Sequence, residues 1–217
     1  MNILRPDSLV FPNLQSANRE GLLALGGDLS VARLLLAYRS GIFPWTDEPL
    51  TWWSPDPRAV FELERFRPPD RLKSKLRNHH FEITIDQAFA SVIHACASPA
   101  PGRESTWISP RFVDAYIELH RAGHAHSVEV WHEGLLVGGV YGVAIAGFFA
   151  GESMFHRVTD ASKIALCYLM DHLRARQFEL FDTQVLSPLT ARLGAIEIRR
   201  REYLERLASA LRNPAKF

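Results

Sequence analysis

The stretch of residues 124–154, HAHSVEVWHEGLLVGGVYGVAIAGFFAGESM, constrains the fold of this chain more than any other stretch. Within it, Val128 and Val130 alternate with Glu129 and Trp131, as residues do in a half-buried strand. The apolar run is interrupted at the tripeptide HEG and again at the dipeptide AG. Short segments of this kind join two strands by a tight turn. The sequence therefore predicts three consecutive strands joined by hairpins.

Five glycines lie inside or beside these predicted strands, where glycine weakens a strand. We interpret them as β-bulges or as places where the backbone of a ligand comes close. They are Gly138, Gly139, Gly142, Gly147 and Gly151.

The third predicted strand ends on a carboxylate, Glu152, which follows Phe148, Phe149 and Ala150. An ionised carboxylate in apolar surroundings is costly unless something pairs with it. Glu152 is therefore either paired, protonated or functional, or it is an edge carboxylate that meets water at a strand end.

A chain of 217 residues can bury a substantial core, and we expect two domains, a small one over residues 1–58 and a larger one over 59–217. The net charge of +1 indicates no polyanionic partner by itself. The two cysteines, Cys96 and Cys167, have no partners at metal-ligand spacing and fit a reducing compartment. No segment resembles a signal peptide or is apolar for the length of a bilayer span, so we expect a cytosolic protein without a membrane partner.

The first domain holds one clear helix, which Ser30 can cap and Gly41 can end. The next segment, IFPWTDEPLTWWSPDPRAV at residues 42–60, is rich in tryptophan and proline and predicts a stiff loop that presents aromatic faces. Such tryptophans either pack in the core under a loop or offer a stacking platform to a nucleobase.

One basic stretch follows between residues 61 and 80. It is either a solvated helix face or the place where this nearly neutral protein contacts phosphate groups. Its basic residues are Arg65, Arg67, Arg71, Lys73, Lys75 and Arg77.

Three further helices have recognisable starts. Asp86 can cap a helix over QAFASVIHACA, and Ser109 with Pro110 opens a helix that Gly123 ends. Thr159 or Asp160 caps a third helix, which packs on the sheet through an apolar stripe. A short helix, a strand and an amphipathic helix close the chain as scaffold.

Three histidines, His120, His124 and His126, could share a face and bind a metal ion. No acidic or cysteine ligand accompanies them, so we expect no metal.

The strand FELFDTQVLSP carries Asp182 and Gln184 two residues apart, which places both side chains on one side of the sheet just before the strand breaks. This pattern is typical of a site, although a polar outer face of an edge strand gives the same pattern.

A set of segments, spread in order over essentially the whole chain, resembles the bacterial leucyl/phenylalanyl-tRNA–protein transferase family. The resemblance implies an α+β fold, in which a small N-terminal domain precedes a larger domain similar to GNAT acetyltransferases, with a mostly antiparallel sheet and flanking helices. The segments are GLLALGGDLS, YRSGIFPW, LTWWSPDPRAV, TWIS, HRAGHAHSVEVW, LVGGVYGV, GESMF, ASKIAL and FDTQVL.

The implied activity moves leucine or phenylalanine, and less readily methionine, from aminoacyl-tRNA to the N-terminal arginine or lysine of a protein, which marks that protein for degradation. By resemblance, Trp45 and Trp107 bind the terminal nucleotide. Glu152, Asp182 and Gln184 are the implied polar centre. The implied pocket for the aminoacyl side chain is lined by Val140, Phe149, Met154, Leu166, Leu169 and Leu173.

Because an aminoacyl ester is already activated, we expect no cofactor, and positioning is the main contribution to catalysis. We expect Gln184 to accept a hydrogen bond from the incoming amine and Asp182 to orient Gln184. Glu152 and Asp182 are the candidate partners for the cation of the acceptor. The basic run from Arg65 to Arg77 is the candidate contact for the tRNA acceptor stem, and a monomer is expected.

Two other readings remain open. An acyltransferase that uses an acyl thioester would need a phosphate-binding loop of the Gln/Arg-x-x-Gly-x-Gly/Ala type, and this string is absent from the sequence. A non-catalytic RNA-binding module could use the tryptophan-rich segment and the basic run, but it would not need three polar residues beside an apolar pocket.

Overall fold

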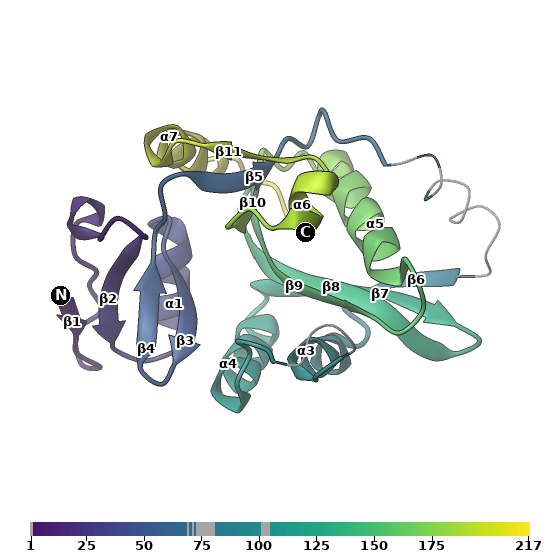
Figure 1. The fold of residues 1–217 in the computed structure, drawn as a ribbon, viewed down its shortest axis with the longest axis horizontal. Helices are drawn as coiled ribbons and strands as arrows, with labels where there is room; N and C mark the ends of the chain where they lie inside the picture. Colours follow the sequence, from purple (N-terminus) through teal and green to yellow (C-terminus); the bar gives the residue numbers. More distant parts are fainter. Residues whose placement is uncertain (1, 69, 71, 73–80, 101–104) are drawn as a thin grey trace.

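The computed structural model describes residues 2–68, 70, 72, 81–100 and 105–217, which form two sheets (Figure 1). The smaller sheet has the strand order β1-β2-β4-β3, with β1 and β2 parallel and the other pairs antiparallel. Its strands, with the short 3-10 helix η1 and the helix α1, span β1 (Asn2–Leu4), η1 (Leu14–Ser16), β2 (Leu22–Gly26), α1 (Val31–Arg39), β3 (Phe43–Asp47) and β4 (Leu50–Trp53).

The tryptophan-rich segment is not the predicted loop, because it forms the hairpin of β3 and β4. Proline has no N–H to donate and is tolerated in a sheet only at an edge, and β3 is an edge strand. Pro44 lies in β3 opposite Trp52, which is fully buried and donates its indole N–H to the carbonyl of Gly26 at 2.9 Å. The prediction failed because it counted the prolines without the edge position that accommodates them.

The larger sheet has seven strands in the order β11-β5-β10-β9-β8-β7-β6. Every neighbouring pair is antiparallel except β9 and β10, which are parallel. The predicted α+β fold with a mostly antiparallel sheet is confirmed, as are the three consecutive strands β7 to β9. The strands span β5 (Arg58–Phe61), β6 (Phe81–Ile85), β7 (Ala125–His132), β8 (Leu135–Ile145), β9 (Phe148–His156), β10 (Leu180–Gln184) and β11 (Ala195–Ile198).

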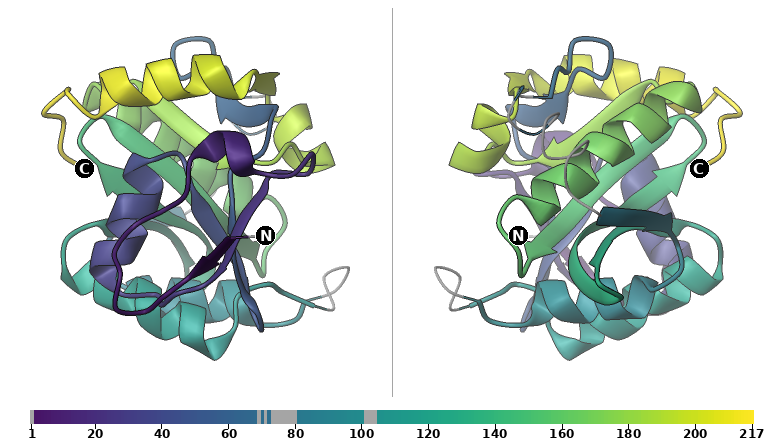
Figure 2. Two further views of the ribbon diagram at one scale, coloured as in Figure 1. Left: turned by 90° about the vertical axis from the view of Figure 1, so that its left-hand side faces the viewer. Right: turned by 90° about the vertical axis from the view of Figure 1, so that its right-hand side faces the viewer.

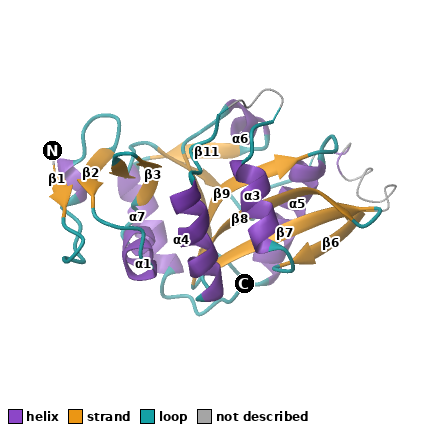
Figure 3. Ribbon diagram, turned by 90° about the horizontal axis from the view of Figure 1, so that it is seen from below, coloured by secondary structure: helices purple, strands orange, loops and turns teal. Residues whose placement is uncertain are grey.

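Helices cover both faces of this sheet. Figure 3 looks at the face on which α3 and α4 lie, and Figure 1 shows α5 on the opposite face. Both views of Figure 2 place α7 on the side of the molecule away from α3 and α4. The helices span α3 (Phe89–Ala97), α4 (Pro110–Arg121), α5 (Ala161–Ala175), α6 (Pro188–Arg192) and α7 (Arg200–Ala210).

Each face of the sheet has its own apolar core, because side chains alternate along the strands. Val140 of β8 belongs to the core beneath α5, whereas its neighbour Tyr141 belongs to the core beneath α3 and α4. The second core continues into the smaller sheet through Trp52 and the residues of α1. In this core α1 packs against α4, and its Tyr38 reaches Glu152 of the larger sheet, where the site described below is located.

The strand glycines make room for protein atoms. A Cβ on Gly138 would lie 2.5 Å from Ala161 of α5, and a Cβ on Gly142 would lie 2.2 Å from the carbonyl oxygen of Ala150. The bulge interpretation is confirmed at Gly142, where the register of β8 and β9 shifts. At Gly138 and Gly142 the close approach is therefore helix and strand packing.

The predicted helix caps are partly confirmed. Ser30 accepts a hydrogen bond from the N–H of Arg33, and Ser109 accepts one from the N–H of Phe112. The prediction for Asp86 is wrong, because α3 has Ala88 at its N-cap and no side-chain cap. The carboxylate of Asp86 accepts instead from the N–H of Ser127 and contacts His126, so a partner 41 residues away replaces the local cap.

Part of the predicted basic run can be located. Arg65 and Arg67 are exposed in the turn and loop after β5, and Arg67 donates to the carbonyls of Glu64 and Phe66. The other four basic residues, Arg71, Lys73, Lys75 and Arg77, lie outside the described residues. Arg65 and Arg67 themselves are not helical. Over the described ranges, the helices lack the length and apolar character that a membrane span requires.

Candidate active site

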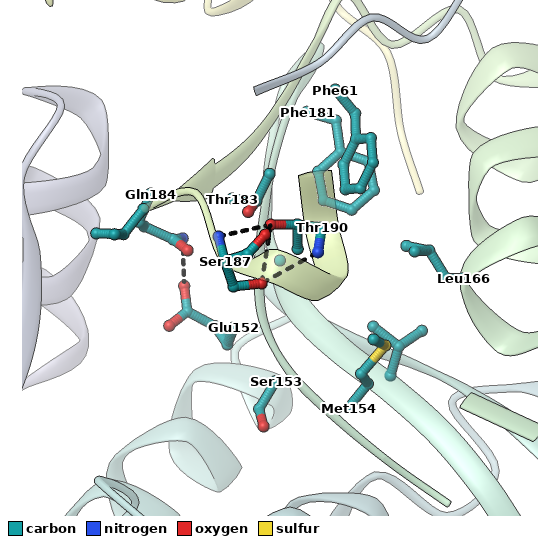
Figure 4. Close-up of a pocket in the computed structure, with 13 residues that line it drawn as sticks. Phe61, Glu152, Ser153, Met154, Leu166, Phe181, Thr183, Gln184, Ser187 and Thr190 are labelled. Atoms are coloured by element: carbon teal, nitrogen blue, oxygen red, sulfur yellow. Dashed lines mark hydrogen bonds between the residues drawn. The ribbon is translucent and has the colours of Figure 1, made fainter. Parts of the chain in front are cut away.

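An apolar cavity of about 210 Å³ opens where β9, β10 and α6 meet (Figure 4). Val140, Met154 and Leu166, all expected to line a side-chain pocket, line it. Phe61 and Phe181 add two aromatic rings, whose centroids lie 5.2 Å apart. The rest of the wall comes from Gly151, Glu152, Ser153, Thr183, Gln184, Val185, Ser187 and Thr190.

Glu152 reaches this cavity because it is the extra residue of a β-bulge. Ser153 pairs with Tyr141 and Gly151 pairs with Gly142, so Glu152 has no partner on β8. A bulge redirects the side chain of its extra residue. Gly142 is required opposite, since a side chain there would collide with the backbone of β9.

Two tyrosines hold the carboxylate of Glu152. Tyr38 of α1 donates its hydroxyl to Oε1 at 2.7 Å, and Tyr116 of α4 donates to Oε2 at 3.1 Å. The two hydroxyl oxygens also lie within hydrogen-bonding distance of each other, although their two protons can fill only two of these three contacts at a time while Glu152 is ionised. Burial raises the pKa of Glu152 to about 7, and the two tyrosine hydroxyls lower it only in part. Glu152 therefore changes charge close to neutral pH.

Gln184 stands on the second irregularity of the sheet. Asp182 pairs with Val60 of β5 and Gln184 pairs with Ala59, so the intervening Thr183 is extra. Gln184 also has a φ of 58°, in the left-handed region that few side chains adopt. The expected alternation of Asp182 and Gln184 on one side is interrupted at this point.

In one orientation the side-chain amide of Gln184 donates from its nitrogen to Oε1 of Glu152 at 3.4 Å (Figure 4). The opposite orientation replaces this single long bond with two shorter ones, from the nitrogen to the carbonyls of Gly151 and Thr183, each at 3.0 Å, and is therefore preferred. In that orientation the amide oxygen faces Glu152. Two acceptor oxygens then lie side by side in the wall shared by the two hollows described here, an arrangement suited to binding the donor groups of a positively charged ligand.

Asp182 does not line the cavity, because its carboxylate is fully buried in an ion pair. Arg58 of β5 contacts it through two nitrogens, Nε to Oδ1 at 2.9 Å and Nη2 to Oδ2 at 2.6 Å. Tyr203 of α7 donates to Oδ2 at 2.8 Å, and the backbone N–H of Gln184 donates to Oδ1 at 2.9 Å. The negative charge of Asp182 is thus already paired inside the protein.

A second hollow of about 180 Å³ adjoins the first and shares Glu152 and Gln184 with it. Trp45 and Trp107, both expected to bind a nucleotide, line it. Trp45 packs edge-on against Trp53 with ring centroids 5.1 Å apart. The structure therefore brings the two tryptophans to the same carboxylate and amide as the apolar cavity.

The remaining three expected pocket residues lie deeper. Phe149, Leu169 and Leu173 are buried in the core beneath α5 and do not line the cavity. The ring of Phe149 packs against that of Phe181, which lines the cavity, with ring centroids 5.2 Å apart. These residues support the wall of the cavity from behind.

Sequence reasoning missed Tyr38, Tyr116 and Arg58. Tyr38 and Tyr116 lie at helical spacing with the apolar residues of α1 and α4, a pattern that predicts the packing of their rings and gives no information on their hydroxyls. A buried tyrosine hydroxyl needs a hydrogen-bond partner, and this is the signal that could have found both. Arg58 carried no local signal, since its partner Asp182 lies 124 residues away.

Of the histidines considered for a metal site, His120 and His126 both lie near Asp86, whose Oδ1 is 3.9 Å from His120 Nδ1. His120 Nδ1 contacts the carbonyl of Ala125 at 2.7 Å, and His126 Nδ1 contacts Asp86 at 2.7 Å. Among the residues that the structure describes, no group of three or more His, Cys, Asp or Glu side chains has the arrangement of a metal site.

The fold is that of an α+β protein with two adjoining hollows, one apolar and one lined by two tryptophans. The polar centre, Glu152 and Gln184, lies where the two hollows join. Models of the leucyl/phenylalanyl-tRNA protein transferase and of its N-terminal domain match residues 60–208 and 27–56.

Curated relatives extend the match over nearly the whole chain. A leucyl/phenylalanyl-tRNA–protein transferase of Syntrophobacter fumaroxidans is 54% identical over 93% of this chain and 88% of its own length. One from Oleidesulfovibrio alaskensis is 50% identical over 97% of this chain and 88% of its own length. The chain belongs to the leucyl/phenylalanyl-tRNA–protein transferase family and is an enzyme of that family.

Solved structures show a weaker likeness. A GCN5-related N-acetyltransferase from Kribbella flavida aligns over 72% of this chain and 56% of its own, with a TM-score of 0.40 and 11% identity. L-PGS from Bacillus licheniformis aligns over 72% of this chain and 53% of its own, with a TM-score of 0.45 and 12% identity. Family membership rests on the sequence relatives.

Proposed function

We propose that this enzyme moves leucine or phenylalanine, and less readily methionine, from aminoacyl-tRNA to the N-terminal arginine or lysine of acceptor proteins, and so marks them for proteolysis. The observation that carries the proposal is the junction of an apolar cavity and a tryptophan-lined hollow at Glu152 and Gln184. An aminoacyl-adenosine has the same two ends, an apolar side chain and a flat base, joined by the reactive ester.

On this proposal the terminal adenine stacks in the hollow lined by Trp45 and Trp107, since aromatic rings bind bases of any sequence. The side chain of the amino acid enters the cavity lined by Val140, Met154 and Leu166. The core residues Phe149, Leu169 and Leu173 determine how far the wall of that cavity can move to admit a larger side chain. The ester carbonyl then lies beside Glu152 and Gln184.

The acceptor carries a cation, and Glu152 is its partner when ionised. The structure supports Glu152 more than Asp182, because the charge of Asp182 is already paired with Arg58. The amide oxygen of Gln184 accepts from the attacking amine. Asp182 serves that step through the backbone of Gln184, whose N–H it holds at 2.9 Å.

The reaction forms one amide bond and breaks one ester bond. The neutral amine attacks the ester carbonyl, the ribose hydroxyl leaves as an alcohol, and the amine proton goes to that oxygen directly or through water. The donor ester is already activated, so no nucleoside triphosphate is consumed. Holding amine and carbonyl in contact supplies most of the acceleration on this proposal.

We further propose that residues 1–58 and 59–217 are the two domains and that the site needs both. Tyr38 from the first part contacts Glu152 from the second. The acceptor stem of the tRNA is proposed to meet the basic run that begins at Arg65, which is exposed. The proposed setting is the cytoplasm, with the enzyme acting as a monomer.

The direct test incubates the protein with radiolabelled leucyl-tRNA and an Arg-initiated peptide without ATP. Labelled peptide is expected, and a peptide that starts with alanine is the matched control that should stay unlabelled. Absence of label on the Arg-initiated peptide, with the tRNA intact, would refute the activity. Label appearing only from an acyl thioester would point to the other class of acyltransferase.

The acceptor site is tested with Glu152→Lys. We expect this variant to lose transfer to Arg-initiated peptides while it binds leucyl-tRNA as the wild type does, since Glu152 is assigned to the cation. Loss of tRNA binding to the same extent would mean that the variant is misfolded. Transfer at the wild-type rate would remove the assignment.

A further inference from the structure

Each oxygen of the Asp182 carboxylate, near the site, accepts two hydrogen bonds, so its capacity to accept is fully used. Oδ1 accepts from Arg58 Nε and from the N–H of Gln184, and Oδ2 accepts from Arg58 Nη2 and from the hydroxyl of Tyr203. Arg58 holds this carboxylate at two points, and together the four donors leave it no free lone pair for a substrate. Its geometry fits a support for Gln184.

Arg58 is itself fixed from several sides. Its Nη1 donates to the carbonyl of Gly41 at 3.1 Å, just after α1. Its guanidinium lies 4.8 Å from the ring centroid of Phe43 and 4.5 Å from that of Tyr203. Both side chains of the Arg58–Asp182 pair are almost completely buried, at 1% and 0% exposure. Elements from the whole chain therefore meet at this ion pair.

Gln184 needs such a support because its backbone conformation is unfavourable. A φ of 58° lies in the left-handed region, which is unfavourable for a residue with a side chain. The bond from Gln184 N to Asp182 Oδ1 compensates for that conformation. Since the left-handed turn directs the Gln184 side chain toward Glu152, any loosening of Asp182 moves the amide oxygen at the junction of the two hollows.

We propose that Arg58 and Tyr203 are positioning residues for the transfer reaction, which act through Asp182 to hold Gln184 at the polar centre. The inference rests on the proposed function, because it assigns a role within that same reaction. It also gives α7 a part in catalysis, since Tyr203 belongs to that helix. Neither Arg58 nor Tyr203 lines either hollow.

Tyr203→Phe is the sharpest variant, because it removes one hydroxyl and keeps the ring that packs on Arg58. We expect kcat for leucyl transfer to fall about three- to tenfold, the factor expected for losing one ordinary hydrogen bond. The KM for leucyl-tRNA stays unchanged, because Tyr203 touches neither hollow. Tyr168→Phe, which removes an exposed hydroxyl from α5, is the matched control and keeps the wild-type kcat.

A purely structural role predicts a different outcome. Tyr203→Phe would then lower the melting temperature and the fraction of active enzyme, with kcat per active site unchanged. Active sites are counted by single-turnover transfer with enzyme in excess. An unchanged kcat per active site overturns the inference.

The route through Gln184 is tested by combining Tyr203→Phe with Gln184→Ala. If Tyr203 acts by placing the Gln184 amide, the hydroxyl no longer matters once the amide is gone, and the double variant transfers within about twofold of Gln184→Ala alone. A further loss equal to that of Tyr203→Phe in the wild type overturns the route.

Arg58→Lys provides a second variant that keeps the charge but loses the two-point contact. It is preferred to Arg58→Ala, which leaves the Asp182 charge buried and unpaired and so endangers folding. We expect Arg58→Lys to lower kcat more than Tyr203→Phe, with the KM for leucyl-tRNA unchanged. A wild type that transfers no leucine at all would refute the proposed function, whereas an active wild type with an indifferent Tyr203→Phe refutes only the inference.

Discussion

Tyr38 donates a hydrogen bond of 2.7 Å to Oε1 of Glu152 across 114 residues of sequence. The tyrosine lies on α1 beside the small sheet, and the glutamate is the bulge residue of β9 in the large sheet. The carboxylate at the polar centre is therefore held by a side chain from the N-terminal part of the chain. The pH at which Glu152 titrates therefore reports on its contact with Tyr38.

Transfer to an Arg-initiated peptide is expected to rise with pH through about 7. Burial raises the pKa of Glu152 to about 7, so below that pH the carboxyl is protonated and neutral, and it cannot pair with the cation of the acceptor. As the pH rises the carboxylate forms and transfer increases. The measurement is kcat/KM for the peptide between pH 5.5 and 8.5, an interval of about 1.5 units on either side of the midpoint.

The amine of the peptide also titrates in this range, with a pKa of about 7.7 to 8.0. Glu152→Gln separates the two, since it retains only the limb that belongs to the amine. A rise at pH 7 that survives in Glu152→Gln would contradict the assignment to Glu152.

Tyr38→Phe is expected to shift the midpoint of that profile upward. The Tyr38 hydroxyl lowers the pKa of Glu152, so its removal leaves the effect of burial less opposed. A hydrogen bond to a charged group of ordinary strength corresponds to a shift of about one unit. Tyr116→Phe, which loses a longer bond of 3.1 Å, should shift the midpoint in the same direction by less. A downward shift in Tyr38→Phe would contradict the contact.

Trp45→Ala is expected to raise the KM for leucyl-tRNA about tenfold or more, because stacking of a base on an aromatic ring contributes about 1–3 kcal/mol. The same increase should appear with a minimal donor such as leucyl-adenosine, since the effect is confined to the terminal base. Trp131→Ala is the matched control. Its indole donates to Thr84 on β6, outside both hollows, so this change affects stability and leaves the KM alone.

Val140→Leu is expected to reduce transfer of phenylalanine relative to leucine. Val140 lines the cavity, and an added methylene there takes space from the larger substrate side chain. One methylene in an apolar pocket is worth about 1–3 kcal/mol, so the ratio of the two kcat/KM values should fall about tenfold or more. Leu166→Val removes a methylene from the same wall and should change the ratio in the opposite direction. Parallel changes in both variants would mean that neither side chain meets the substrate.

The parts of this fold that depend on neighbours in sequence were predictable. Alternation in β7 and the breaks at HEG and AG predicted the three strands β7 to β9, and capping residues such as Ser30 and Ser109 marked the helices α1 and α4. Cavity residues such as Val140 were expected through resemblance to the family, and the structure places Val140 in the cavity wall. These features need no knowledge of distant contacts.

The features that depend on distant contacts were not predictable. A regular strand would put Asp182 and Gln184 on one side, but a bulge and a left-handed residue divide them between an ion pair and the cavity. Tyr38 and Arg58 acquire their roles only when the chain brings Glu152 and Asp182 to them. The polar centre is thus specified by pairs more than a hundred residues apart, which no local pattern records.

The two hollows share Glu152, Thr183, Gln184 and Val185. A compound designed to occupy both must therefore carry its linking group at this shared wall, within reach of a carboxylate and an amide. A stable amide or sulfonamide in place of the labile ester would satisfy that demand. The boundary between the hollows sets the point of attachment for an inhibitor of this enzyme.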